Sequence, residues 1–268
     1  MMTVLLFMVE WALLAVPGSE VAPDWAGTAA MGAPEAVMWD PYLPLVWRGA
    51  LGCQPIPGEE YTTLDVEGPP TKRPAEDHPD LNLALRGYRI ADTGAELVYY
   101  GTGDDPRAPQ LRGLFADGRL PTFTTGYRVY DWDWVSDCRG RLLADRAVTL
   151  AGLRVDPGET IHVPNSGYEI ESGYEVLVLY ASEERITLKY TREDDAVYGY
   201  TLHVEGVCVE PRLLALYRTQ NEAGRAELPA LRAGQAFGRA RGNEIGVAIR
   251  DTGRFLAPNS KGDWWRWK

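Results

Sequence analysis

The chain has 268 residues, 45% hydrophobic and 24% charged, which is enough apolar material to bury a sizeable core. Its formal net charge of −11 argues against a nucleic-acid partner, because the phosphate backbone would be repelled. The 28 glycines and 19 prolines, spread between short apolar runs, favour a β-rich fold over a helical one.

Residues 1–22 have the character of a secretory signal peptide. An apolar run over 4–16 is followed by small residues up to Ala22, as in a hydrophobic region and its cleavage zone. Glu10 interrupts the run, and Pro23 would follow the cut site, so a misplaced start or an apolar N-terminal helix is the alternative. The run is too short for a comfortable membrane span. We expect a secreted or cell-surface bacterial protein without a stable membrane span after signal removal.

The three cysteines lie in two kinds of context. Cys53 and Cys138 occupy loop sequences with Gly or Pro nearby, where a disulfide could close, whereas Cys208 lies inside the alternating run VEGVCVE. We therefore predict a Cys53–Cys138 bridge and a free, buried Cys208. The chain has no C-x-x-C pair, which argues against a thiolate zinc site.

Residues 23–143 are predicted to form a Pro-rich N-terminal β region. The prolines of 23–80 interrupt helices and strand ladders, so we expect this stretch to extend over the surface of another domain. Strand-like alternation follows over 81–90, 95–100 and 127–134.

Residues 144–268 are predicted to form a C-terminal β-domain. Its strongest signal is a series of alternating apolar runs at 174–180, 185–190, 198–210, 231–240 and 244–251. One helix is expected over 212–228, ending near Gly224. The fold class predicted from these patterns is mainly β, with an antiparallel domain of barrel-sandwich type.

Part of this domain resembles the lysostaphin-like (LytM-type) zinc endopeptidases, which cut peptidoglycan cross-bridges. The segment 231–238, L-R-A-G-Q-A-F-G, is similar to the family's V-K-A-G-Q-x-I-G. Residues 214–217 resemble its T-L-Y-A-H-L strand, and 255–258 resemble its closing segment. The A-G-Q-x-x-G pattern also recurs in lipoyl- and biotinyl-type domains. The resemblance covers about the last hundred residues and implies a LytM-like β-domain.

The zinc ligands of that family are missing from this chain. Its catalytic strand needs two histidines two residues apart, so that both face one metal ion. Those positions hold Glu244 and Gly246, and the family's H-x-G-x-D motif has no counterpart. The resemblance therefore implies a degenerate relative that binds rather than cuts, with no metal and no cofactor.

Tyr130, Trp132 and Trp134 form a candidate binding ladder, because period-two spacing places them on one strand face. Such a face could stack on sugar rings, or it could pack beneath the Pro-rich segment. The spacing predicts that the three rings are either all buried or all available. Asp131 and Asp133 share the opposite face, as a binding or inverting-glycosidase pair or as solvated or turn-bonded side chains.

Two histidines offer a weaker metal or acid–base site. His203 alternates with Thr201 and Glu205 on the polar side of its strand, and His162 could join it, although a structural role is the alternative. Residues 193–195 are expected at a charged hairpin tip that is solvated, with calcium binding as the alternative.

The terminal sequence DWWRWK could bind a glycan or dock on its own domain. Taken with the patterns above, the sequence predicts a secreted, non-catalytic binding or structural module of a bacterial cell envelope, with polysaccharide or peptidoglycan as partner. The alternative is a cell-wall or polysaccharide hydrolase, either metallopeptidase-like or using a carboxylate pair.

Overall fold

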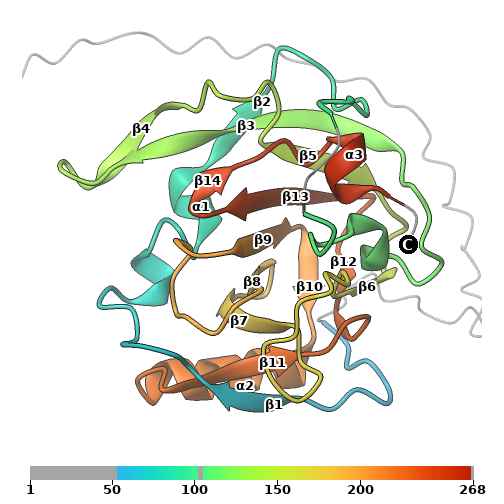
Figure 1. The fold of residues 1–268 in the computed structure, drawn as a ribbon. Coiled ribbons are helices and arrows are strands. Elements are labelled where there is room, and N and C mark those ends of the chain that lie inside the picture. The colour runs from blue at the N-terminus through green and yellow to red at the C-terminus, as the bar shows by residue number, and fades with distance from the viewer. Residues whose placement is uncertain (1–52, 102–104, 267–268) are drawn as a thin grey trace, which may run out of the picture. The chain divides into compact units, whose positions relative to one another are not determined.

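The computed structural model describes residues 53–101 and 105–266, which belong to one compact unit spanning Arg48–Lys268. The expected signal segment 1–22 and the stretch 23–52 lie outside the described residues. The described part is mainly β, as the sequence predicts (Figure 1). Its strands are β1 (Thr62–Asp65), β2 (Tyr88–Ile90), β3 (Phe123–Asp133), β4 (Cys138–Leu142), β5 (Leu150–Arg154), β6 (Thr160–His162), β7 (Val176–Ala181), β8 (Arg185–Lys189), β9 (Tyr200–Glu205), β10 (Val207–Val209), β11 (Glu227–Leu231), β12 (Ala236–Ala240), β13 (Glu244–Asp251) and β14 (Arg254–Phe255). Its helices are α1 (Leu83–Arg86), α2 (Pro211–Glu222) and α3 (Lys261–Trp264), with 3-10 turns η1 (Ala75–Asp77) and η2 (Leu111–Leu114).

Most of the described strands join one large antiparallel sheet. Its order is β1-β11-β7-β8-β9-β13-β5-β3-β2, and β14 and β4 add to it by pairing with β13 and β3. A second, three-stranded sheet has the order β10-β12-β6. The path of the large sheet runs from β1 at one end to β2 at the other, so its order does not close on itself.

The main hydrophobic core lies between these two sheets. Alternation along β8, β9 and β13 directs every second side chain into it, and residues of β6, β10 and β12 meet them. The fully buried members from these strands are Ile186, Leu188, Leu202, Val204, Ile245, Val247, Ile249, Ile161, Val207, Val209 and Phe237. Each contributes roughly 1.5–3 kcal/mol relative to an exposed position.

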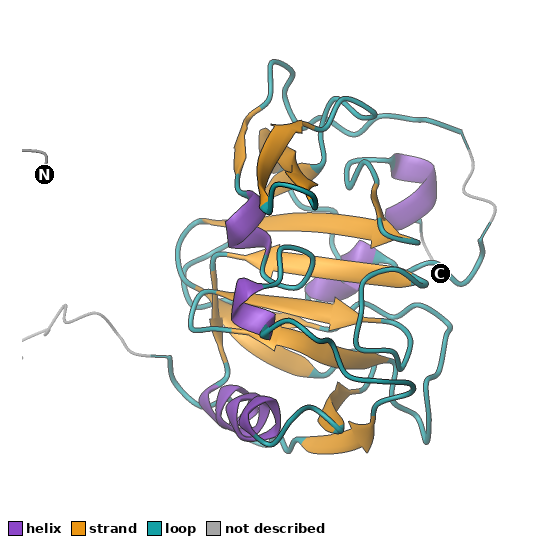
Figure 2. Ribbon diagram, turned by 90° about the vertical axis from the view of Figure 1, so that its left-hand side faces the viewer, coloured by secondary structure: helices purple, strands orange, loops and turns teal. Residues whose placement is uncertain are grey.

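Helix α2 confirms the one long helix expected from the sequence. It begins where the Glu210 carboxylate accepts hydrogen bonds from the backbone amides of Arg212 (2.6 Å) and Leu213 (2.9 Å), with Pro at the first helical turn. Leu213 and Tyr217 are buried, and the helix contacts β11 and β7 at one end of the sheet (Figure 2). Gly224 follows with a positive φ of 96°, which favours glycine after a helix.

The expected domain boundary at 143/144 is wrong for the described part of the chain. Strand β1 pairs with β11, and β3 pairs with β5, so strands from both sides of 143/144 share one sheet. A proline removes a backbone N–H donor only at its own position in a strand. The run of β1 contains no proline and can therefore pair at the sheet edge. The described part of the Pro-rich stretch, from residue 53 onward, is thus built into the same unit.

The disulfide prediction is also wrong: Cys53 bonds to Cys208, with a Cα–Cα distance of 5.3 Å, and Cys138 is a free, exposed thiol. The reason is the alternation of β10. Val207 and Val209 face the core, so Cys208 between them faces away from it and meets the N-terminal segment.

We expect one reactive thiol per native chain, belonging to Cys138, because the other two cysteines are oxidised. The joint change Cys53→Ser and Cys208→Ser opens a link across 155 residues and should lower the free energy of unfolding by roughly 2–5 kcal/mol. Urea unfolding measures this loss, and Cys138→Ser is the matched control with an unchanged midpoint. Peptide mapping that finds Cys138 in a disulfide would contradict the assignment.

Candidate functional site

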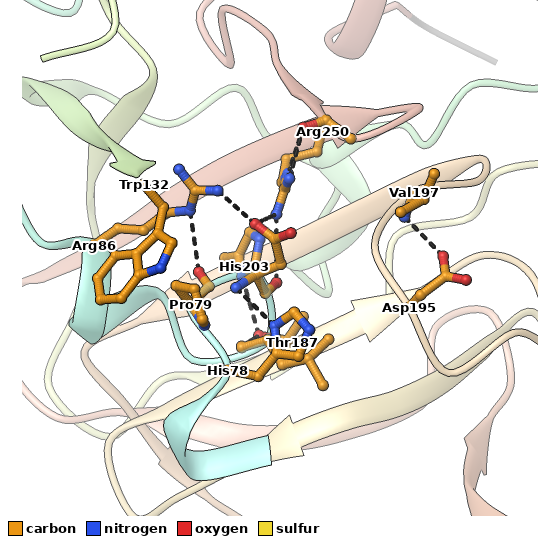
Figure 3. A network of polar contacts seen from close by, with 12 residues as sticks. His78, Pro79, Arg86, Trp132, Thr187, Asp195, Val197, His203 and Arg250 are labelled. Carbon is orange, nitrogen blue, oxygen red and sulfur yellow. Dashed lines mark hydrogen bonds and ion pairs between the residues drawn. The ribbon is translucent and has the colours of Figure 1, made fainter. Parts of the chain in front are cut away.

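The face of the large sheet that points away from the main core is polar along β9, and it is nevertheless buried. Thr201, His203 and Glu205 share it, as the alternation predicts, but Thr201 and His203 are fully buried and Glu205 is 6% exposed. Residues 78–86 and Phe255 cover this face, and Figure 3 shows the resulting contacts from close by. Buried polar groups of this kind require partners, since leaving one unpaired costs roughly 1–3 kcal/mol.

Asp80 joins two buried arginines at the centre of this network. Its Oδ1 atom accepts a hydrogen bond from Arg86 at 2.6 Å and another from Arg250 at 2.9 Å. The arginines are only 4% and 3% exposed, and their remaining donors reach backbone carbonyls, including those of Pro79 and Gly253 (Figure 3). The network therefore fastens α1 and the segment before it onto β13.

The charge balance around Asp80 keeps it ionised. Burial by itself raises the pKa of the Asp80 carboxyl, but Arg250 and Arg86 outweigh this effect and hold the pKa at about 2. Relative to 3.8 in an unfolded chain, this difference corresponds to a stabilisation of about 2 kcal/mol at neutral pH. That contribution is lost as the pH falls from 3.8 through about 2.

His203 is held as a neutral ring within the same face. The Thr187 hydroxyl donates to the Leu81 carbonyl at 2.6 Å, so His203 Nδ1, 3.0 Å from the same oxygen, is assigned as the donor to it. Burial, reinforced by the positive charge of Arg250, lowers the pKa of His203 to about 3. Its Nε2 atom is buried and finds no partner among the described residues. His203 also stacks on Phe255.

The predicted aromatic ladder does not form a single platform. Tyr130 and Trp132 lie two residues apart in β3 and are half-buried, whereas Trp134 follows the end of β3 and is 52% exposed. The expectation that all three rings share one environment is therefore wrong. The cause is a turn after Asp133, whose carboxylate accepts the amides of Val135 (2.9 Å) and Ser136 (3.1 Å) and ends the alternation.

Each ring of the ladder has its own polar neighbour. The Tyr130 ring lies 5.2 Å from the Arg139 guanidinium, and the Trp132 indole donates to Asp137 at 3.2 Å. The Trp134 ring meets Arg73 and His78 from the Pro-rich segment. The exposed Asp131 carboxylate lies 3.3 Å from the buried Arg86 guanidinium, while Asp133 is turn-bonded. The structure does not assemble this pair into a site.

The positions compared with zinc ligands also have structural roles. Glu244 accepts hydrogen bonds from the hydroxyls of Tyr127 (2.8 Å), Thr125 (3.2 Å) and Thr124, and it lies over Gly152. A side chain at Gly246 would press against Leu150, because its Cβ would lie 3.1 Å from that residue.

The two candidate histidines are not brought together. His162 lies on β6 of the small sheet, and His203 faces away from that sheet, with the main core between them. In the described part of the chain, no cluster of three or more His, Cys, Asp or Glu side chains could hold a metal ion.

A pocket at one end of β9 and β13 is the best candidate for a ligand site. Its volume is about 310 Å³, within the range of roughly 300–1,000 Å³ of small-molecule sites. We call it the Tyr200 pocket. Its lining combines aromatic, acidic, basic and small apolar residues, namely Tyr100, Asp105, Ala108, Arg146, Tyr200, Asp251, Leu256, Ala257, Ser260, Asp263 and Trp264.

Sheet register and the C-terminal segment build this pocket together. Tyr200 pairs with Asp251 across β9 and β13, so both side chains leave the sheet on one side. Trp264, in α3, is 3% exposed and meets the Tyr200 ring edge-on at 5.8 Å, and its indole donates to the Ala257 carbonyl at 2.9 Å. Trp264 and Trp265 thus dock on their own unit, whereas Trp267 lies outside the described residues.

Hydrogen bonds fix the charges inside the Tyr200 pocket. Burial raises the pKa of Asp105, but hydrogen bonds from Tyr168 (2.7 Å), the Arg107 amide (2.8 Å) and Tyr200 (3.3 Å) outweigh it, so the pKa lies below its usual value. Burial, with the negative charges of Asp105 and Asp251, raises the pKa of Tyr200. Asp105 is therefore an anion, and Tyr200 is a neutral phenol that can donate.

Sequence reasoning missed the Tyr200 pocket because its parts are far apart in the chain. Two lining residues, Asp263 and Trp264, belong to the terminal DWWRWK sequence, which carries an aromatic signal. No family model, curated protein or solved structure matches this chain. In the residues that the structure describes, no helix has the length and apolarity needed to cross a membrane.

Asp80→Ala should lower the free energy of unfolding by roughly 3–5 kcal/mol, because it leaves Arg86 and Arg250 buried without their carboxylate. Chemical denaturation measures the change. Asp137→Asn is the matched control, since it removes the charge of an exposed partner of Arg73 at a position where asparagine keeps the backbone conformation, and its unfolding midpoint should stay as in the parent chain. Equal midpoints for both variants would show that Asp80 does not hold this face together.

His203 should make the chain less stable as the pH falls from 6.5 toward 3. The unfolded chain binds this proton near pH 6.5, whereas the folded chain resists it down to about 3, so protonation favours unfolding in that window. His203→Gln should flatten the curve of melting temperature against pH between 4 and 6.5, above the range where Asp80 titrates. His78, whose pKa burial also lowers, is tested separately with His78→Gln. An unchanged slope in His203→Gln would refute the assignment.

Proposed function

We propose that this chain is a secreted, non-catalytic binding module of a bacterial cell envelope, and that it binds a glycan in the Tyr200 pocket. The observation that carries the proposal is the lining of this pocket. Flat rings favour the C–H faces of sugars, and carboxylates and phenols hydrogen-bond to sugar hydroxyls. A volume of about 310 Å³ suits one or a few rings at the end of a glycan.

The disulfide supports the secreted part of the proposal. Disulfides persist in oxidising compartments and are rare in the cytosol, where thiols are kept reduced. The Cys53–Cys208 bond closes a link across 155 residues and fastens the N-terminal end of the described chain to β10. Such a bond fits a chain whose first 22 residues have the character of a signal peptide.

The envelope part of the proposal comes from the resemblance to LytM-type endopeptidases. The matching segment 231–238 runs from β11 through a turn into β12, so it lies in a strand–turn–strand context. Residues 214–217, compared above with a strand of that family, belong instead to helix α2. We therefore take from the resemblance the envelope setting and leave its catalytic chemistry aside.

The alternative, a cell-wall or polysaccharide hydrolase, gains no specific support from the geometry. Its metal version needs His162 and His203 in one site, and they lie on separate sheets. Its carboxylate version needs Asp131 and Asp133 to share a substrate, and one is paired with Arg86 while the other closes a turn. Binding without cleavage is the function that the arrangement supports best.

Titration calorimetry with soluble peptidoglycan fragments and a panel of oligosaccharides tests this proposal. Tyr100→Ala and Asp251→Asn should each weaken binding about tenfold, because each removes a stacking or hydrogen-bonding group from the Tyr200 pocket. Trp134→Ala is the matched control and should bind like the parent chain. Loss of binding in Trp134→Ala, with binding kept in the pocket variants, would show that the glycan binds at the aromatic ladder. Absence of binding to every glycan would refute the proposal.

A further inference from the structure

The lining of the Tyr200 pocket carries more negative than positive charge, while Arg107 and Arg266 contact Asp105 from outside the lining. Three aspartates line it, Asp105, Asp251 and Asp263, against one guanidinium, Arg146. None of the three aspartates forms an ion pair with a cation among the described residues, where they accept hydrogen bonds from hydroxyl and amide groups instead. Arg146 is exposed, and its guanidinium lies 5.9 Å from the Tyr100 ring, at the wall of the pocket.

We propose that the glycan recognised in the Tyr200 pocket carries a protonated amine, as an amino sugar without its acetyl group does. This inference rests on the proposed function and specifies its ligand. An ammonium group supplies positive charge to a lining that has an excess of two negative charges, and it donates hydrogen bonds that carboxylates accept most strongly. A neutral sugar would cover three carboxylates without supplying a counter-charge, which costs free energy on desolvation.

The aromatic part of the lining points to the same ligand class. A cation within about 6 Å of an aromatic face is attracted by the ring quadrupole, and the pocket presents Tyr100 and Tyr200 beside its carboxylates. Burial is the main cause of the raised pKa of Tyr200, and the negative charges of Asp105 and Asp251 raise it further, which agrees with a negative potential at that ring. Rings and carboxylates around one cavity are the combination that recognises organic ammonium groups.

The spacing of the carboxylates favours an organic cation over a metal ion. A metal needs several ligand atoms within about 2.6 Å of one point, and no cluster of three or more suitable side chains exists in the described ranges. Here the charges are instead distributed around a cavity of about 310 Å³. The ligand must therefore fill space as well as supply charge.

The test compares two probes that differ only in N-acetylation: chitosan oligosaccharide, which carries free amines, and chitin oligosaccharide of the same length. Calorimetry on the full chain should show binding of the chitosan form at least about tenfold tighter, and added salt should weaken it. Asp251→Asn and Asp263→Asn should remove most of this preference. Asp137→Asn is the matched control, because it removes the same charge outside the pocket and should keep the preference.

The outcomes separate the two proposals. Equal affinity for both probes, or a preference that survives in the pocket variants, overturns the amine assignment and leaves glycan binding in place. Failure of both probes and of every glycan in the wider panel overturns the proposed function together with this inference. A melting temperature close to that of the parent chain verifies that each variant is folded.

Discussion

The buried contact of Asp80 with Arg86 and Arg250 is the constraint on which the rest of this unit depends. It allows the polar face of the large sheet to be covered, since it supplies each guanidinium with a carboxylate and leaves the remaining donors to backbone carbonyls. It also fixes the register of β13. Because Arg250 must point toward Asp80, its neighbour Asp251 must point to the other side, where it pairs with Tyr200 at the pocket.

A second buried ion pair and the disulfide hold the opposite part of the unit in a similar way. Asp194 and Arg225 form a two-bonded pair at 2.6 and 2.7 Å, both almost fully buried, and Asp194 also accepts the Thr71 amide at 3.0 Å. This contact ties a loop before β9 to the end of α2 and to the Pro-rich segment. Long-range polar contacts and the disulfide thus anchor residues 53–80, in which β1 is the one described strand.

The sequence reveals the strands and the long helix because their signals are local. Alternation over 185–190 and 244–251 and the glycine stop of α2 at Gly224 depend on neighbouring residues, and the structure places β8, β13 and α2 there. What covers a strand face is not local. Alternation places Thr201 and His203 on one face, but nothing in their strand shows that the segment holding Asp80 and Arg86, more than a hundred residues earlier, buries that face.

Asp194, Cys208 and the Tyr200 pocket show the same limit, because the partners of each come from distant parts of the chain. Asp194 was expected at a solvated tip because acidic residues usually avoid burial, and its partner Arg225 is recognisable only after folding. Cys208 was expected to be buried because it lies in a strand, although its alternation with Val207 and Val209 was evidence that it faces outward. The Tyr200 pocket combines five separate stretches of chain, so no pattern within one stretch could predict it.

The central claim is that ligand binding occurs at the Tyr200 pocket and leaves the β3–β4 turn unaffected. Its most direct test is a titration of the 15N-labelled chain with chitosan oligosaccharide, followed through the tryptophan indole N–H resonances. The Trp264 indole donates to Ala257, which also lines the pocket, so its resonance should shift with ligand. The resonances of Trp132 and Trp134 should stay in place. Shifts confined to Trp132 and Trp134, with Trp264 unchanged, would contradict the account.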